Sequence, residues 1–312
     1  MTVVTPVWVW LPGRDQPTRA GELVNGHSAR FVYRPDYART EGALALDPVE
    51  LRISRSSRGT AVLGADGLPG VVRDAKPAGY GEDRLKAIHG DHLDALQLLE
   101  LGVPDGVGAI EACNDIERKL QWRPKGLADL QQLTEYLEGH EPASRALRRL
   151  NDDLDTSAGG ERPKATLVHE GRLWLVKMQA RGDRQAMPAR EFVTMRLAEQ
   201  VGLHVAPVKL HTFGAHQVLM VQRFDREHTN QGYLRFGLVS GLTVLDCGDS
   251  HLDRERWSYP LLADNLRRWS DKPEADCTEL FRRMVFNAAV TNNDDHPRNH
   301  ALLHRQKGWR LS

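Results

Sequence analysis

The sequence has no excess of either charge and few cysteines. Lys and Arg total 42 and Asp and Glu total 42, so no global field draws the chain to nucleic acid or to an acidic membrane. Cys113, Cys247 and Cys277 are far apart and lack metal-type pairing, which indicates a reducing compartment. No apolar run is as long as a membrane span, and the first residues lack the pattern of a signal peptide. These absences predict a cytoplasmic protein with no membrane partner.

The length and the first half of the chain predict a small β-rich unit followed by helices. At 312 residues the chain can form two domains or one bilobal domain. The apolar runs at residues 3–13 and 29–34 predict strands. Residues 54–81 have a loop-like composition, rich in Gly, Arg, Ser and Pro, and helical patterns follow at residues 82–101 and 127–150.

The second half carries sharper signals. Residues 165–179 form two alternating apolar runs around Glu170-Gly171, which predicts a β-hairpin. A helix is predicted at residues 187–202, a strand at 216–225 and a helical stretch at 235–246. The chain then shows a helix at residues 276–292 and a final hairpin with its turn at Lys307-Gly308. The apolar stripe predicted to face the core in that helix consists of Leu280, Phe281, Met284, Val285, Ala288 and Ala289.

Polar residues crowd behind this apolar helix in "TNNDDHPRNH", where Asp294 and Asn299 have the spacing D-x-x-x-x-N. In phosphoryl transfer an Asp at this position accepts the proton of the attacking hydroxyl, and an Asn five residues later ligates Mg²⁺. A Gly-rich loop with Gly159 and Gly160, then a strand with Lys177, precede this segment in the order that such chemistry requires.

A helix follows that strand, and its Glu191 is suited to hold Lys177 against phosphate oxygens. Each element also has an ordinary structural explanation. A glycine pair is often only a turn, a strand Lys can extend to solvent, and a Glu early in a helix complements the helix dipole. The combination in this order, rather than any single member, indicates a kinase-like site.

Two kinds of metal site are alternatives to this interpretation. His296, His300 and His304 recur every four residues, but Pro297 makes a continuous helix through them improbable. An EF-hand loop fails too, because no Gly occupies its sharp turn. We expect His296 to order the loop and the other two histidines to be structural.

Several segments resemble the HipA-type serine/threonine kinases of bacterial toxin–antitoxin modules. They are "TSAGGERPKATL", "LWLVKMQ", "REFVTMRLAEQVGL", "VLMVQRFDRE" and "ELFRRMVFNAAVTNNDDHPRNHALL". "VVRDAKPAGYGEDRL" is similar to the segment that joins the family's N-terminal β domain to its kinase core. The resemblance implies ATP and Mg²⁺ as cofactors, Asp294 as catalytic base, Asn299 as metal ligand and Lys177 as phosphate contact. Gln222, Arg223 and Phe224 would form the hinge that reads adenine through backbone groups.

The resemblance also implies regulation and partners. Ser157 matches the loop serine that becomes autophosphorylated, with Thr156 as the adjacent alternative. The implied partners are a HipB-like helix-turn-helix antitoxin and a protein substrate such as an aminoacyl-tRNA synthetase, with DNA reached only through the antitoxin. The fold implied is an α+β, bilobal protein-kinase-like fold, with an N-terminal β-rich domain at 1–115, an N-lobe at 116–224 and an incomplete C-lobe at 225–312.

The chain departs from this pattern at its end. Kinases of this type have a second metal-binding Asp shortly after a segment like "GWRLS", whereas the sequence stops at Ser312. A natural truncation, a fragment or half of a split kinase would each explain this, and we expect little kinase activity without the missing Asp. The rival functions are a non-catalytic module that engages an antitoxin or nucleotide, and a small-molecule phosphotransferase.

Overall fold

The computed structural model describes residues 2–26, 28–53, 58–62, 67–130, 157, 164–178, 186–213, 216–305 and 308–312. Within these residues, helices and strands are mixed along the chain, which confirms the α+β prediction. No helix in the described ranges is long and apolar enough to cross a membrane.

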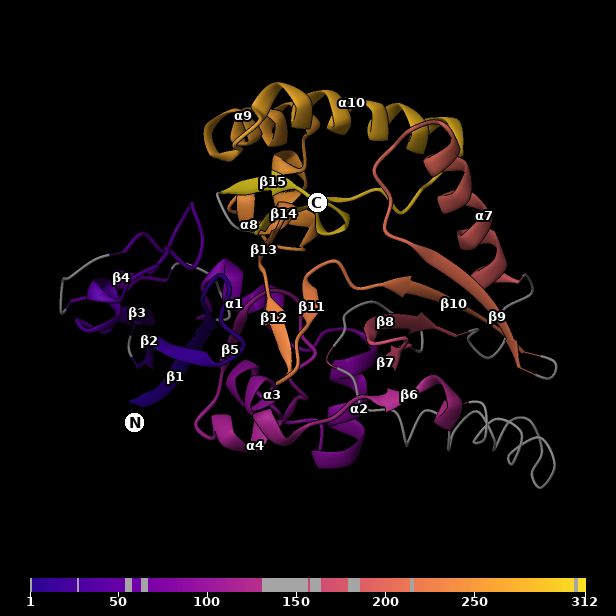
Figure 1. The fold of residues 1–312 in the computed structure, drawn as a ribbon. Helices are drawn as coiled ribbons and strands as arrows, with labels where there is room; N and C mark the ends of the chain where they lie inside the picture. Colours follow the sequence, from indigo (N-terminus) through magenta and orange to yellow (C-terminus); the bar gives the residue numbers. More distant parts are fainter. Residues whose placement is uncertain are drawn as a thin grey trace.

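The N-terminal sheet has five strands in the order β4-β3-β2-β1-β5 (Figure 1). Val7 and Val9 of β1 are buried whereas Trp8 between them is half-buried, the alternation expected of a strand with one face on a core. The predicted strands at residues 3–13 and 29–34 are confirmed, while the polar, Gly-containing strand between them was missed. The strands are β1 Val3–Trp10, β2 Pro17–Asn25, β3 Arg30–Tyr33, β4 Thr60–Ala61 and β5 Ile110–Ala112.

The segment between the sheets is more helical than its composition suggested. Residues 70–75 form helix α1 inside the stretch predicted to be a loop. The single helix predicted at 82–101 is wrong, because Gly90 has a φ of 104° and Asp94 starts a new helix with a capping box to Gln97. The elements are η1 Tyr37–Arg39, α1 Gly70–Ala75, α2 Tyr80–His89, α3 Ala95–Leu101, α4 Ile116–Gln121 and β6 Lys125–Gly126.

A second sheet has the strand order β6-β7-β8-β10-β9, and helix α7 packs on β9 and β10. The hairpin prediction is confirmed, since Glu170 and Gly171 connect β7 and β8 with φ of 54° and 70°. The helix prediction is also confirmed, with Pro188 in its first turn and Gly202 beyond its end. The elements are β7 Lys164–His169, β8 Arg172–Lys177, α7 Met187–Gln200, β9 Val208–Phe213 and β10 His216–Gln222.

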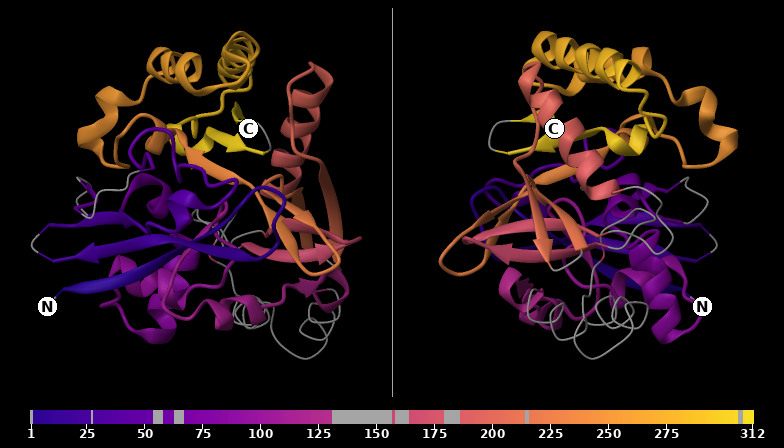
Figure 2. Two further views of the ribbon diagram at one scale, coloured as in Figure 1. Left: turned by 60° about the vertical axis from the view of Figure 1, so that its left-hand side comes forward. Right: turned by 90° about the vertical axis from the view of Figure 1, so that its right-hand side faces the viewer.

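The C-terminal part contains two small sheets, β11-β12 and β13-β14-β15, and two long helices, α9 and α10, which lie over the second sheet (Figure 2). The helical stretch predicted at 235–246 is wrong for residues 237–240, which form strand β13, and holds only for the single turn of helix α8. The two strands of the final hairpin are confirmed, while Lys307 of its predicted turn lies outside the described residues. The elements are β11 Arg226–His228, β12 Tyr233–Arg235, β13 Gly237–Ser240, α8 Gly241–Val244, η2 His251–Arg256, α9 Tyr259–Trp269, α10 Pro273–Ala289, η3 Pro297–Asn299, β14 Ala301–His304 and β15 Trp309–Leu311.

The predicted apolar stripe of α10 is mostly not in the core. Leu280 is buried, Met284 is half-buried, and Phe281 and Val285 are 59% and 49% exposed. Helical periodicity predicts which residues share a face, but it does not show whether another element covers that face.

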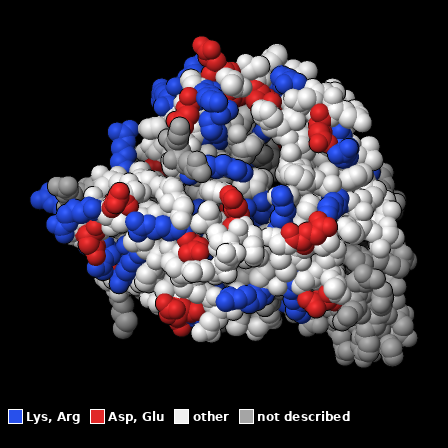
Figure 3. Space-filling view, viewed as in Figure 1, with Lys and Arg blue, Asp and Glu red and all other residues white. Residues whose placement is uncertain are grey.

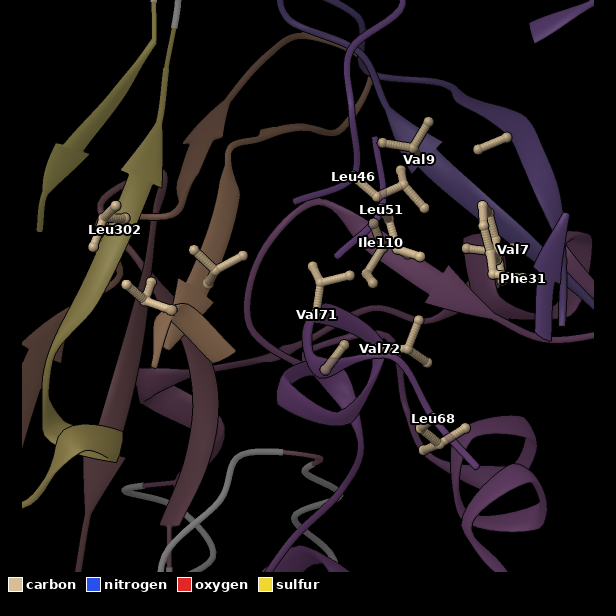
Figure 4. Close-up of a cluster of buried hydrophobic side chains, with 14 of the residues drawn as sticks. Val7, Val9, Phe31, Leu46, Leu51, Leu68, Val71, Val72, Ile110 and Leu302 are labelled. Atoms are coloured by element: carbon tan, nitrogen blue, oxygen red, sulfur yellow. The ribbon is translucent and has the colours of Figure 1, made fainter. Parts of the chain in front are cut away.

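The largest hydrophobic core joins the two ends of the chain. It brings Val7 and Phe31 of the N-terminal sheet together with Val72 of α1 and Leu302 of β14 (Figure 4). A separate cluster, which includes Leu167, lies in the sheet of β7, β8 and β10. The N-terminal unit and the C-terminal sheet are therefore packed as one body of apolar side chains. The division into three domains stays a prediction.

Candidate active site

The predicted contact between strand β8 and helix α7 is present. Lys177, the last residue of β8, places its Nζ 2.5 Å from Oε1 of Glu191 in the second turn of α7. Both side chains are about one-third to two-fifths exposed, so the pair is open to solvent on one side. A cation held in this way at the end of a central strand can bind an anionic ligand.

Asp294 and Asn299 lie in the loop after α10, and the structure brings these two predicted residues together. The Asn299 Nδ2 donates to the backbone carbonyl of Asp294, which fixes the amide group. The Asp294 side chain is 85% exposed, with its Oδ1 3.2 Å from Nε2 of His296. Thr291, with a φ of 54°, turns the chain from the helix into this loop.

A partly buried network of hydrogen bonds holds the loop. Asp295 accepts from the hydroxyl of Tyr259 at 2.6 Å, and its Oδ1 lies 3.1 Å from Nε2 of His300. Burial lowers the pKa of His300, and burial with the Asp295 contact raises that of Tyr259. We predicted a structural His300, but Asp295 and Tyr259 were missed. The doubled Asp in "DDH" was the available signal for Asp295, whereas nothing in the sequence marks Tyr259 of α9.

The two halves of the site are linked through helix ends. Arg282 of α10 donates to the carbonyl of Val201 at 2.7 Å, and Glu279 of α10 accepts from the N–H of His204 at 3.0 Å. Helix α7, which carries Glu191, is thereby tied to α10, which leads into the loop with Asp294 (Figure 1).

The predicted hinge is partly engaged within the fold. The backbone N–H groups of Gln222 and Arg223 donate to Pro207 and Leu173 at 2.9 and 2.8 Å. Adenine recognition by residues 222–224, with the 40% exposed Phe224 at its end, therefore depends on the remaining backbone groups and stays a prediction.

The Arg223 side chain enters a buried charge cluster. Asp225 accepts from Arg223 and Arg226, and its Oδ2 also accepts the N–H of Gly108 at 2.9 Å. The same two arginines donate to backbone carbonyls of residues 105–108. The hinge is thus fixed to the segment that follows α3.

Ser157 is docked on that same segment. Its N–H donates to Oδ1 of Asp105, and its Oγ donates to the carbonyl of Val103 at 2.6 Å. Only 3% of the residue is exposed. The other loop residues singled out, Thr156, Gly159 and Gly160, lie outside the described residues.

The oxygen atoms of the loop fit Mg²⁺, a hard cation that prefers carboxylate and carbonyl oxygens. Because the Asn299 amide nitrogen points to Asp294, its oxygen is directed to the other side, and the Asp294 carboxylate is exposed. In the described part of the chain no group of three or more His, Cys, Asp and Glu side chains is arranged to hold a metal on its own. A magnesium site here would therefore need ligands from a bound nucleotide.

A family model for the HipA-like C-terminal domain matches residues 156–312, half of the chain. The chain belongs to the HipA family. The serine/threonine-protein kinase toxin HipA of Shewanella oneidensis is 26% identical over 178 residues, which are 49% of this chain and 40% of that protein. Y4mE of Sinorhizobium fredii is 26% identical over 140 residues, 39% of this chain and 30% of its own. This chain thus spans well under half the length of the curated relatives that it matches.

The fold is similar to that of HipA from Shewanella oneidensis MR-1, solved in a complex with HipB and operator DNA. The TM-score is 0.71 with 19% identity, and the match covers 99% of this chain and 74% of that one. At this identity the likeness shows the fold alone, and it confirms the HipA-like bilobal fold. On the face shown in Figure 3, Lys and Arg side chains are interspersed with Asp and Glu, in keeping with the zero net charge.

Proposed function

We propose that this chain is the nucleotide-binding part of a HipA-type serine/threonine protein kinase, which transfers the γ-phosphate of ATP to a protein hydroxyl. The observation that carries the proposal is the Lys177–Glu191 ion pair, at 2.5 Å and open to solvent. Phosphoryl transfer needs a positioned cation at the phosphates, and a Glu on the adjoining helix holds the Lys in place for it.

The loop after α10 supplies the other groups. The exposed carboxylate of Asp294 is free to accept the proton of an attacking hydroxyl, and His296 beside it limits its orientation. Mg²⁺, bound by Asn299 and by the nucleotide, would neutralise charge on the phosphates. The partly buried Asp295 contacts keep the loop backbone in place while the substrate binds.

The regulatory part of the proposal concerns Ser157. The Ser157 hydroxyl donates a hydrogen bond to the carbonyl of Val103. Ser157 must therefore leave this docked position before it can accept a phosphate. The added charge of about −2 would then face the Asp105 carboxylate and oppose redocking. By likeness to the solved HipA–HipB complex we propose a HipB-like antitoxin as partner. From the resemblance of the sequence to HipA-type kinases we further propose an aminoacyl-tRNA synthetase as the protein substrate.

Calorimetry of Mg-ATP binding tests the proposal. Lys177→Ala should weaken binding about ten- to a hundredfold, because it removes a charge-assisted phosphate contact. The matched control is Lys209→Ala in β9, an exposed lysine paired with Glu170 at 2.8 Å in the same sheet, which should leave the affinity unchanged. Equal affinity of the Lys177 and Lys209 variants would remove Lys177 from the site.

A phosphoryl-transfer assay separates catalysis from binding. Asp294→Asn should abolish transfer to a protein hydroxyl and leave the affinity for ATP nearly unchanged, because the residue acts on the hydroxyl and not on the nucleotide. The assay uses the chain joined to a C-terminal segment that supplies the second metal-binding Asp expected from the sequence. ATP binding without transfer by this joined protein would favour the rival function, a nucleotide-binding module.

A further inference from the structure

Asp74, in the N-terminal half of the chain, contacts the turn where strand β13 ends and helix α8 begins. It lies in α1, outside the family-matched residues 156–312. Helix α1 packs against β13 and α8. Gly70 of α1 approaches so closely that an added Cβ would lie 2.7 Å from the Thr243 side chain. The two elements are therefore held in close contact.

The Asp74 carboxylate accepts three hydrogen bonds from this turn. Its Oδ2 accepts from the N–H of Ser240 at 2.7 Å and from Oγ1 of Thr243 at 2.8 Å, and its Oδ1 accepts from Oγ of Ser240 at 2.6 Å. Both donor residues are buried, so without Asp74 their polar groups would lose partners away from water. The Ser240 hydroxyl also caps α8 by accepting from the N–H of Thr243.

The turn that Asp74 contacts is itself hydrogen-bonded to the loop that carries Asn299. The N–H of Gly241 donates to the carbonyl of His300 at 2.7 Å, and Ser240 pairs with Ala301. Gly241 also lies against the loop itself, since a Cβ there would be 2.4 Å from the carbonyl oxygen of Pro297. The backbone on both sides of Asn299 is thus set by residues 240 and 241.

We propose that Asp74 is a positioning residue that couples the N-terminal half of the chain to the loop of Asp294 and Asn299. It acts through Ser240 and Gly241 and touches neither nucleotide nor substrate. The proposal rests on the proposed function for its consequence at Asn299, but its structural step stands on the contacts alone. The N-terminal half is therefore part of the working site and not only an appended domain.

Hydrogen exchange measured by mass spectrometry tests the structural step on the full chain without nucleotide. Asp74→Ala should raise the exchange of amides in residues 240–241 and 299–301 about tenfold or more, the ratio that corresponds to a lost hydrogen bond. Asp74→Asn should restore much of the protection, because its amide oxygen can accept from the Ser240 N–H while its NH₂ donates to the Ser240 hydroxyl.

The matched control is Asp47→Ala. Asp47 is fully buried in the N-terminal half and accepts from the N–H groups of residues 49–51, so its loss loosens that half without touching the turn. In this variant the hydrogen exchange of backbone amides should rise near residues 49–51 and not at residues 299–301. Unchanged exchange at 299–301 in Asp74→Ala, or an equal rise in the Asp47 variant, would overturn the proposal. If Asp74→Ala does not fold, Thr243→Val, which removes one of the three bonds, replaces it.

Calorimetry then tests the consequence at Asn299. Asp74→Ala should reduce the gain in ATP affinity that Mg²⁺ provides by about tenfold, while metal-free ATP binding stays as in the unaltered protein. An equal loss with and without Mg²⁺ would show a general structural effect and refute positioning. Absence of ATP binding in every protein would refute the proposed function, and the exchange result would still decide the role of Asp74.

Discussion

Replacing Asp225 with Asn should destabilise the protein more than any surface charge change. Asp225 is the acceptor at the centre of the buried cluster: Oδ1 accepts from Nε of Arg223 at 3.0 Å, and Oδ2 from Arg223 and Arg226 at 2.7 and 2.9 Å. Side chains of all three residues are at most 7% exposed. Although burial alone would raise the pKa of Asp225, the two guanidinium groups hold it below its usual range.

The size of the stability loss follows from the chemistry of the Asn amide, whose NH₂ group cannot accept a hydrogen bond. Both oxygens of Asp225 accept from N–H donors, so an Asn in either orientation turns its NH₂ group toward a donor. The two arginines would keep their charges without a carboxylate between them. Removing one partner of a buried ion pair costs about 3–5 kcal/mol. That is a large part of the total free energy of unfolding, roughly 5–15 kcal/mol for a folded domain.

Urea denaturation followed by tryptophan fluorescence measures the free energy of unfolding. The control is Asp264→Asn, which breaks an exposed pair with Arg267 and should cost no more than about 1 kcal/mol. If both variants lose the same small amount, the buried cluster does not stabilise the junction between residues 105–108 and the hinge, and our reasoning is wrong.

Two further predictions concern single buried contacts. Ser157→Ala should lose about 1 kcal/mol of stability and Ser157→Glu clearly more, because the new charge faces Asp105; equal urea midpoints would contradict the docked position. The Asp276 carboxylate accepts hydrogen bonds from Arg310 and Ser270. Burial alone would raise the pKa of Asp276, but these hydrogen bonds have the larger effect and hold its pKa below the usual range. The stabilisation by the Asp276 carboxylate is therefore complete above the pKa of the unfolded state, about 4, and is lost as the pH falls through the lower pKa of the folded state. The difference in free energy of unfolding between the unaltered protein and Asp276→Asn should therefore shrink between pH 6 and pH 3.

The sequence by itself determined the local elements of the second half. Glu170-Gly171 between two apolar runs fixes the β7–β8 hairpin, because only such a turn matches the twist of the strands. Pro188 and Gly202 bracket α7 for equally local reasons. The order of hairpin and helix predicted a contact between Lys177 and Glu191, and the packing of α7 on the sheet makes it. The spacing of Asp294 and Asn299 likewise places both in one loop.

Tertiary structure alone decided which polar groups meet and which apolar faces are covered. Asp74 and Ser240 are 166 residues apart in the chain, and Asp225 meets the N–H of Gly108 across 117 residues. Hydrophobic periodicity and secondary-structure propensity show which residues share a face of one helix or strand. They contain no information about contacts between residues that are far apart in the sequence. For the same reason the sequence marked Phe281 as part of the core, although packing leaves it exposed. Local chemistry fixes a turn or a helix end, whereas burial depends on what the rest of the chain brings alongside.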